Sequence, residues 1–192
     1  VVHSGHRLAL ASSGGFNERV AECQAAAKEI QGLLGRPETQ AASYLGDVES
    51  ADYEAIAGQL SLISRRRAAH YFTEMARVEA GCKAWTRGDV AGFGQLMSAS
   101  CESSIVNYET GTPALIGLVE ALWPLQGVYG ARFSGAGSRG CVVALVAADA
   151  RVDQAREDGA TSLYFSAWKG HIEVVNALVA AGAGVDQARK SG

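Results

Sequence analysis

The sequence predicts an α+β protein, because helix-like and strand-like patterns occupy different parts of the chain. Apolar residues recur at helical spacing over much of residues 17–121, whereas residues 127–146 contain two strand-like runs around a glycine-rich loop. The last part differs again, since a repeat with a period of 33 residues begins at Leu145. We therefore expect two units of different architecture, residues 1–147 and residues 148–192.

The composition is that of an ordinary globular protein, with 48% hydrophobic and 19% charged residues among 192. A net charge of −3 gives no electrostatic reason to expect nucleic acid or membrane partners, and no stretch approaches the ~18 apolar residues of a spanning helix. The four cysteines form no Cys-x-x-Cys pair, which favours reduced thiols and a cytoplasmic protein. No metal site is expected, since His3-x-x-His6 lacks further ligands at suitable spacing.

The start of the sequence is strand-like and has no initiator Met, from which we expect a fragment that begins within a domain. A first helix is predicted at about residues 17–34 with Asn17 as its N-cap, and a second at about residues 52–62. A long helix follows at about residues 64–86, ended by Gly88. Its expected buried stripe consists of Ala68, Phe72, Met75, Val78 and Cys82.

Two more helices and a hairpin complete the first unit. Asp89 is the expected N-cap of the fourth helix, and Thr112 with Pro113 opens a fifth that runs through Ala121. Strands are predicted at residues 127–134 and 141–146, with residues 135–140 as the loop between them.

The repeat in the last part of the chain resembles an ankyrin repeat. Residues 145–159 align with residues 178–192, and 11 of the 15 positions are identical. The residues that carry the ankyrin signature are Gly159, Thr161, Leu163, Ala167, Gly170, His171, Val174, Val175 and Leu178. The resemblance implies an all-α segment, made of the end of one repeat and one complete repeat, with a possible protein partner. Because a stable stack needs roughly three repeats, this segment would need a cap.

The glycine-rich hairpin of residues 127–141 resembles the third motif of the GHMP-type small-molecule kinases. Residues 4–23 resemble the segment that enters the first long helix of galactokinase-like members, and residues 67–78 resemble a helix that precedes the motif. Phe133-Ser-Gly-Ala-Gly137 and His70-Tyr-Phe72 are most similar to galacturonokinases. The resemblance implies that residues 1–147 are the C-terminal half of such a kinase, a ferredoxin-like domain that lacks its closing helix and strand.

The family's chemistry is transfer of the γ-phosphoryl group of ATP to a sugar hydroxyl with Mg²⁺. The resemblance places a nucleotide or substrate loop at Arg132, Ser134, Gly135, Ala136, Gly137 and Ser138, with Arg139 as a further candidate charge. Phe16 stands where the family commonly has a sugar-contacting Tyr, so the ring is kept and the hydroxyl is lost. No catalytic residue is expected in this chain, because the phosphate-binding motif and the catalytic Asp belong to the N-terminal half. We therefore expect the chain to be inactive alone, and to use ATP and Mg²⁺ only when that half completes it.

Two alternatives remain open, an ankyrin-mediated interaction module and a chimeric product without catalytic activity. Other candidate residues are given structural roles. His70 with Glu74 is interpreted as a helix-surface or packing pair, and Arg65-Arg66-Arg67 as a solvated stretch at a helix start. Cys141 is expected to be a buried structural thiol, and the three tryptophans to be packing residues, namely Trp85, Trp123 and Trp168.

Overall fold

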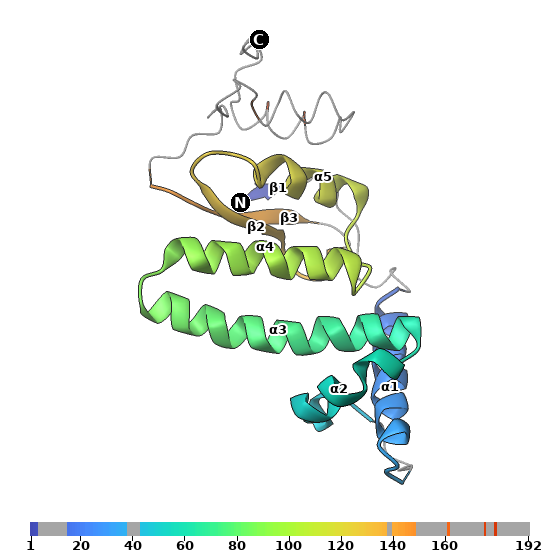
Figure 1. Ribbon diagram of the computed structural model, residues 1–192. Coiled ribbons are helices and arrows are strands. Elements are labelled where there is room, and N and C mark those ends of the chain that lie inside the picture. Colours follow the sequence, from blue (N-terminus) through green and yellow to red (C-terminus); the bar gives the residue numbers. More distant parts are fainter. Residues whose placement is uncertain are drawn as a thin grey trace, which may run out of the picture.

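The computed structural model describes residues 1–3, 15–37, 43–137 and 140–148, together with the single residues Thr161, Val175 and Val179 (Figure 1). The α-helices are α1 (Gly15–Leu33), α2 (Ser50–Ile56), α3 (Leu62–Thr86), α4 (Val90–Val106) and α5 (Pro113–Leu122). The strands are β1 (Val2–His3), β2 (Val128–Phe133) and β3 (Cys141–Val146). Two short 3₁₀ helices, η2 (Leu45–Asp47) and η3 (Ala57–Gln59), flank α2. None of the helices in these described parts is long and apolar enough to cross a membrane.

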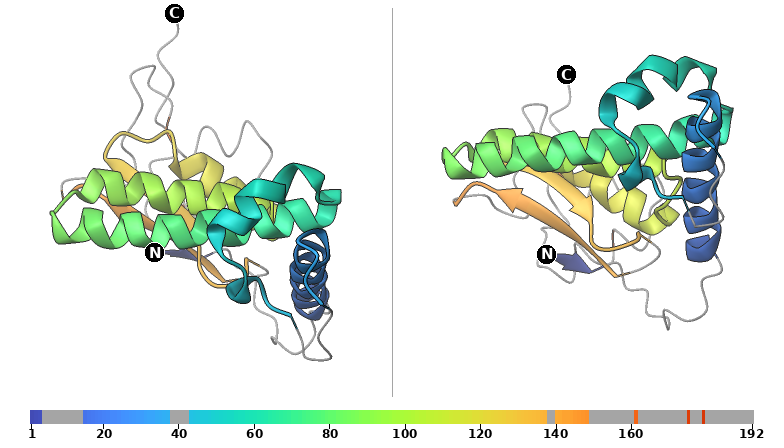
Figure 2. Two further views of the ribbon diagram at one scale, coloured as in Figure 1. Left: turned by 60° about the horizontal axis from the view of Figure 1, so that its bottom comes forward. Right: turned by 90° about the horizontal axis from the view of Figure 1, so that it is seen from below.

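The three strands form an antiparallel sheet in the order β1-β3-β2. Val142 of β3 lies between Val2 of β1 and Phe133 of β2, which fixes the register of all three strands. Figure 1 shows the sheet between α5 and α4, with α3 running alongside α4 and α1 at the N-terminal end of α3. The views in Figure 2 show the same order from two other directions. The predicted α+β class is therefore confirmed, and helices dominate it.

Two separate cores hold these elements together. The first, which we call the sheet core, joins α5, β2, β3 and the C-terminal part of α4, and its buried members include Cys101, Leu115, Leu118, Phe133 and Val142. The second, the helical core, joins α1, η2, α2 and the start of α3, and includes Ala26, Ala27, Ile30, Leu45, Ile56 and Ala68. Helix α3 therefore contributes to the helical core with its first turns and contacts α4 with the rest of its length.

Local sequence signals explain where the helices begin and end. Asp89 Oδ1 accepts a hydrogen bond from the Gly92 amide, and Thr112 Oγ1 accepts one from the Leu115 amide, so both predicted N-caps are confirmed. Gly88, directly after the cap residue of α3, has a φ of 71°, a conformation that glycine adopts without penalty. Helix α1 begins at Gly15, however, so the prediction of Asn17 as its N-cap was wrong.

The predicted buried stripe of α3 is correct in its first half and wrong in its second. Ala68 is buried and Phe72 is half-buried against the helical core, but Met75 is 52% exposed, Val78 is 59% exposed and Cys82 is exposed as well. The face of α3 that meets α4 carries small residues instead. Gly81 and Ala84 are buried there, and a side-chain carbon at Gly81 would lie 3.4 Å from the Phe93 ring. Small residues let two helices approach closely, so the contact with α4 does not use the apolar stripe.

Only three residues beyond Ala148 are described. Thr161 is buried, Val175 packs against the sheet core, and Val179 lies in helical backbone with 43% exposure. The other predicted ankyrin positions lie outside the described residues, as do Trp168 and the loop residues Ser138 and Arg139.

Candidate functional site

Strands β2 and β3 form a hairpin, and the described part of the loop between them depends on glycine for its backbone conformation. The Ser134 amide donates to the Cys141 carbonyl at 2.8 Å, which closes the base of the loop. Gly135 and Gly137 have φ values of 64° and 71°, in the left-handed region that glycine favours. A side-chain carbon at Gly137 would lie 2.5 Å from the Phe133 ring, so this position also needs glycine for space.

The loop is anchored on one side and exposed on the other. The Thr112 amide, at the N-cap of α5, donates to the Gly137 carbonyl at 2.9 Å. Ser134, Gly135 and Ala136 are exposed, and none of them carries a charge. The loop can therefore bring its backbone close to a ligand, since no large side chain stands in the way.

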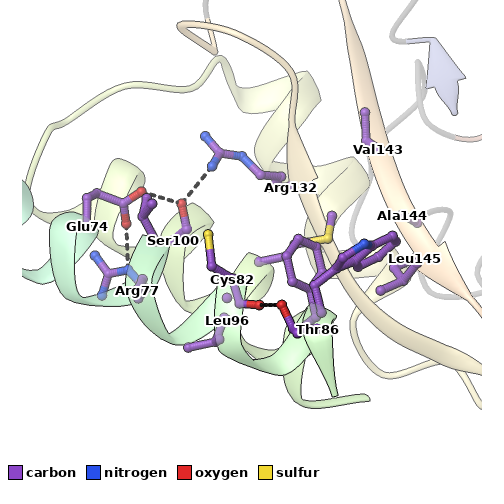
Figure 3. Close-up of a pocket in the computed structure, with 15 residues that line it drawn as sticks. Glu74, Arg77, Cys82, Thr86, Leu96, Ser100, Arg132, Val143, Ala144 and Leu145 are labelled. Carbon is purple, nitrogen blue, oxygen red and sulfur yellow. Dashed lines mark hydrogen bonds and ion pairs between the residues drawn. The ribbon is translucent and has the colours of Figure 1, made fainter. Parts of the chain in front are cut away.

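Arg132 does not project from this loop. It lies in β2, where its Nη1 donates to Ser100 Oγ of α4 at 2.7 Å and its Nε donates to the Phe133 carbonyl at 3.3 Å. Ser100 Oγ in turn donates to Glu74 Oε2 at 2.7 Å, and Glu74 Oε1 accepts from Arg77 Nε at 2.5 Å. These four residues, Glu74, Arg77, Ser100 and Arg132, form a chain of polar contacts that ties β2 to α4 and α3 (Figure 3).

Glu74 therefore has different partners from those the sequence indicated. Burial alone would raise the pKa of Glu74, but hydrogen bonds from Ser100 and Arg77 outweigh it and leave this pKa below the usual 4.5. His70 Nδ1 and Ser103 Oγ are hydrogen-bonded at a distance of 3.0 Å, and the His70 ring stacks on the Tyr108 ring. Burial lowers its pKa, so His70 acts as a neutral packing residue, one of the two structural roles expected.

The central charged group, Arg67, was missed by the sequence analysis. Arg67 is 1% exposed, and its guanidinium donates to Glu22, to the Asn107 carbonyl and to Glu109. The prediction of a solvated stretch was wrong at this position, because α1 and the segment after α4 both cover it. Glu109 has a φ of 53°, uncommon for a residue with a side chain, and its carboxylate reaches both Arg66 and Arg67. Arg67 is the last residue of a run of three arginines, and nothing in the sequence distinguishes it from Arg65 and Arg66.

The remaining candidates lie apart from the loop. Phe16 is in the first turn of α1 and is 61% exposed, and no hydrogen bond or ring contact joins it to the loop within the described residues. Cys141 is half-buried, so it is not the buried thiol expected. Trp85 is 62% exposed, but its ring packs edge-on against Phe93, which is a packing role as predicted. Trp123 is a packing residue, as predicted, and its Nε1 donates to the Ala131 carbonyl at 2.9 Å.

The described residues do not form a metal site. No group of three or more His, Cys, Asp or Glu side chains among them could hold a metal ion. Mg²⁺ in phosphoryl-transfer sites is commonly held by one or two carboxylates together with substrate phosphates, so the described residues supply no complete metal site of their own.

Comparisons with known proteins relate most of this chain to sugar kinases. Residues 79–163 match the family model described as GHMP kinases C terminal. The galacturonokinase of Arabidopsis thaliana is 49% identical over 146 residues, which cover 76% of this chain and 34% of that protein. A galactokinase of Streptococcus thermophilus is 36% identical over 150 residues, covering 78% of this chain and 37% of that protein. The chain thus spans about a third of the length of these relatives.

A solved structure shows the same relationship in three dimensions. The galactokinase of Lactococcus lactis, determined in complex with galactose, superposes with a TM-score of 0.66 and 26% identity, over 94% of this chain and 41% of that one. This chain therefore contains a GHMP kinase C-terminal domain and is homologous to the C-terminal part of galacturonokinases and galactokinases.

Proposed function

We propose that this chain is the C-terminal part of an ATP-dependent sugar-1-kinase of the galacturonic acid or galactose class. The observation that carries the proposal is the 49% identity to a galacturonokinase over 146 residues, which include the hairpin of β2 and β3. Galactokinase relatives and the galactose complex are consistent with the same class of sugar. ATP and Mg²⁺ would be used by the enzyme as a whole.

Within that enzyme, the loop at Ser134–Ser138 would face nucleotide or sugar, and Phe16 would keep a ring near the sugar without a hydroxyl. Glycine in the left-handed region and exposed small residues support the role of the loop, because a ligand can come within contact distance of its backbone. Arg132 would act indirectly, since its bond to Ser100 holds β2 just before the loop begins.

The 192 residues would not be sufficient for catalysis. They contain no Gly-Leu-Gly-Ser-Ser-Ser-like stretch for the triphosphate. We expect no sugar phosphate from the purified chain incubated with radiolabelled ATP, Mg²⁺ and either galacturonate or galactose. Product formation above the no-enzyme control would contradict this proposal.

Complementation tests the kinase assignment itself. The chain is co-expressed with the N-terminal two thirds of the Arabidopsis galacturonokinase, and the purified complex is assayed for phosphorylation of galacturonate. We expect Ala136→Leu to lower this activity at least tenfold if the loop faces a ligand. The matched control is Ala51→Leu, at an exposed position of α2, which should leave the activity unchanged. A stable complex without activity would count against the kinase proposal.

A second candidate function rests on the 33-residue repeat. In this hypothesis, residues 148–192 form an ankyrin-type segment that binds a protein, and residues 1–147 serve as its cap. A related alternative is a chimeric product that has no catalytic activity. The kinase family match ends at residue 163, within this segment. The interaction reading predicts binding partners that are lost on deletion of residues 148–192, and partners unchanged by that deletion would contradict it.

A further inference from the structure

An apolar groove lies on the side of the molecule where α3 and α4 face β3. It has a volume of about 820 Å³ and is lined by the second half of α3, by residues 93–100 of α4, by Arg132 of β2 and by residues 143–145 of β3 (Figure 3). This volume is in the range of sites that bind small organic molecules. The groove is separate from the hairpin loop proposed for nucleotide or sugar, because Ser134–Gly137 are not among its lining residues.

The walls of the groove are apolar side chains that the fold leaves uncovered. Val78 is 59% exposed and Trp85 is 62% exposed, and both line it. Trp85 is held edge-on against Phe93, with ring centroids 5.2 Å apart, so it forms a fixed wall. A ligand that covered these side chains would gain about 25 cal/mol for each Å² of apolar surface removed from water.

At one end of the groove, the Arg132 guanidinium has no ion-pair partner among the described residues. The charged lining residues are Glu74, Arg77 and Arg132, and Glu74 forms its ion pair with Arg77. Arg132 donates only to the neutral oxygens of Ser100 and Phe133, and within the described residues it has no ion-pair partner. Two of its five N–H donors are used in this way, so further donors remain for an acceptor that enters the groove.

We propose that this groove binds a small amphipathic organic anion. Its apolar body would lie between Trp85, Val78 and β3, and its carboxylate would meet Arg132 at the polar end. An ionised acceptor suits an arginine whose present partners are neutral, because hydrogen bonds between two charged groups are the stronger kind. Charge and shape thus select an anion with one polar end, rather than a sugar, whose hydroxyls would leave the apolar walls uncovered.

The described residues of the C-terminal segment do not line the groove. Thr161, Val175 and Val179 are absent from its lining, and Val175 packs against the sheet core. The polar end also argues against a purely apolar partner, because such a partner would bury the Arg132 guanidinium without an added acceptor.

Calorimetric titration of the full chain with decanoate tests the proposal, with decanol as the uncharged probe. We expect saturable, one-to-one binding of decanoate that weakens about tenfold in Arg132→Gln, while decanol binds both proteins equally weakly. Val78→Asp, which puts a negative charge into the groove at an exposed site, should also weaken decanoate binding. Val106→Asp is the matched control, since Val106 is 54% exposed on α4 and does not line the groove.

Three results would overturn the proposal. The first is the absence of saturable decanoate binding by a folded chain, and the second is binding that Arg132→Gln and Val78→Asp leave unchanged. The third is concentration-dependent dimerisation in sedimentation experiments that Val78→Asp abolishes and Val106→Asp does not, because a second copy would then be the occupant. None of these results depends on sugar phosphorylation, so failure here would leave the proposed kinase function untouched.

Discussion

At the scale of single residues, Arg67 shows how one charge can connect parts of the chain that lie far apart. Its guanidinium contacts Glu22 of α1 at 2.7 Å and Glu109 of the segment after α4 at 2.6 Å. Tyr108 adds its ring, with the Arg67 Cζ atom 6.0 Å from the ring centroid. Burying an arginine is costly unless its donors find partners, so these contacts are required for the fold.

We expect Arg67→Leu to lower the free energy of unfolding by about 3 kcal/mol, because it removes the buried cation that Glu22 and Glu109 share. Arg66→Leu is the matched control. Arg66 also pairs with Glu109, but both side chains are 40% exposed, and such a pair contributes less than about 1 kcal/mol. Urea unfolding followed by circular dichroism measures both changes. Equal decreases in the free energy of unfolding in the two variants would contradict the central role of Arg67.

The same cluster makes stability depend on pH. The hydrogen bond from Arg67 lowers the pKa of Glu109, and in Glu22 the hydrogen bonds from Arg67 and Arg19 outweigh the opposing effect of burial. Because these pKa values are lower in the folded state, the two ionised carboxylates stabilise the fold at a pH above their ordinary pKa of 4.5. This stabilisation is lost as the pH falls below 4.5 and the carboxylates of the folded chain become protonated. We therefore expect the stability difference between the native chain and Arg67→Leu to shrink from pH 6 to pH 3. A difference that stays constant over this range would contradict the assignment.

At the scale of elements, the contact between α4 and β2 depends on two glycines. Gly94 and Gly130 face each other so closely that a side-chain carbon at Gly94 would lie 2.5 Å from the Tyr129 carbonyl carbon and oxygen. Backbone atoms cannot move aside as a flexible side chain could. This contact places α4 along β2, where the Ser98 hydroxyl accepts from the Ala131 amide at 3.2 Å.

We expect Gly94→Ala to destabilise the protein by about 3 kcal/mol, since the added methyl group would push α4 away from β2. Gly32→Ala, also in a helix, should have the opposite sign and stabilise by at most about 1 kcal/mol, because nothing lies within 4 Å of the added carbon. Thermal unfolding of the two variants compares them directly. A stable Gly94→Ala variant would show that α4 and β2 can separate without loss of the fold.

The elements that could be predicted are those with signals inside the element. Asp89, Thr112 with Pro113, and Gly88 mark helix ends through local hydrogen bonds and backbone conformation, so they were found from sequence. The exposure of Val78 and the burial of Arg67 depend on which other elements cover α3, and spacing along the helix carries no information on that. The loop between β2 and β3 was recognised by its glycines, whereas the turn of Arg132 towards Ser100 follows from the packing of α4 on β2.

At the scale of the whole molecule, one position of the repeated sequence occurs in two different backbone conformations. Leu145 and Val146 begin the first copy and lie in strand β3, where Leu145 pairs with Gly130. Val179, the counterpart of Val146 at an offset of 33, lies in helical backbone. Strand pairing in the sheet therefore overrides any local preference that the repeated residues share. At this position, the repeat in sequence is not accompanied by a repeat in backbone conformation.

Val175 allows a test of whether the C-terminal segment is independent of the kinase domain. Val175 packs against the sheet core and is half-buried, so Val175→Asp should lower the free energy of unfolding by about 2 kcal/mol. Val179→Asp is the matched control, because Val179 also lies in helical backbone but is 43% exposed. If residues 148–192 fold as a separate unit, Val175→Asp will leave the main unfolding transition unchanged and affect only a second, smaller one. A single transition that shifts with Val175→Asp, and not with Val179→Asp, would instead make the segment a structural part of the domain that contains the hairpin.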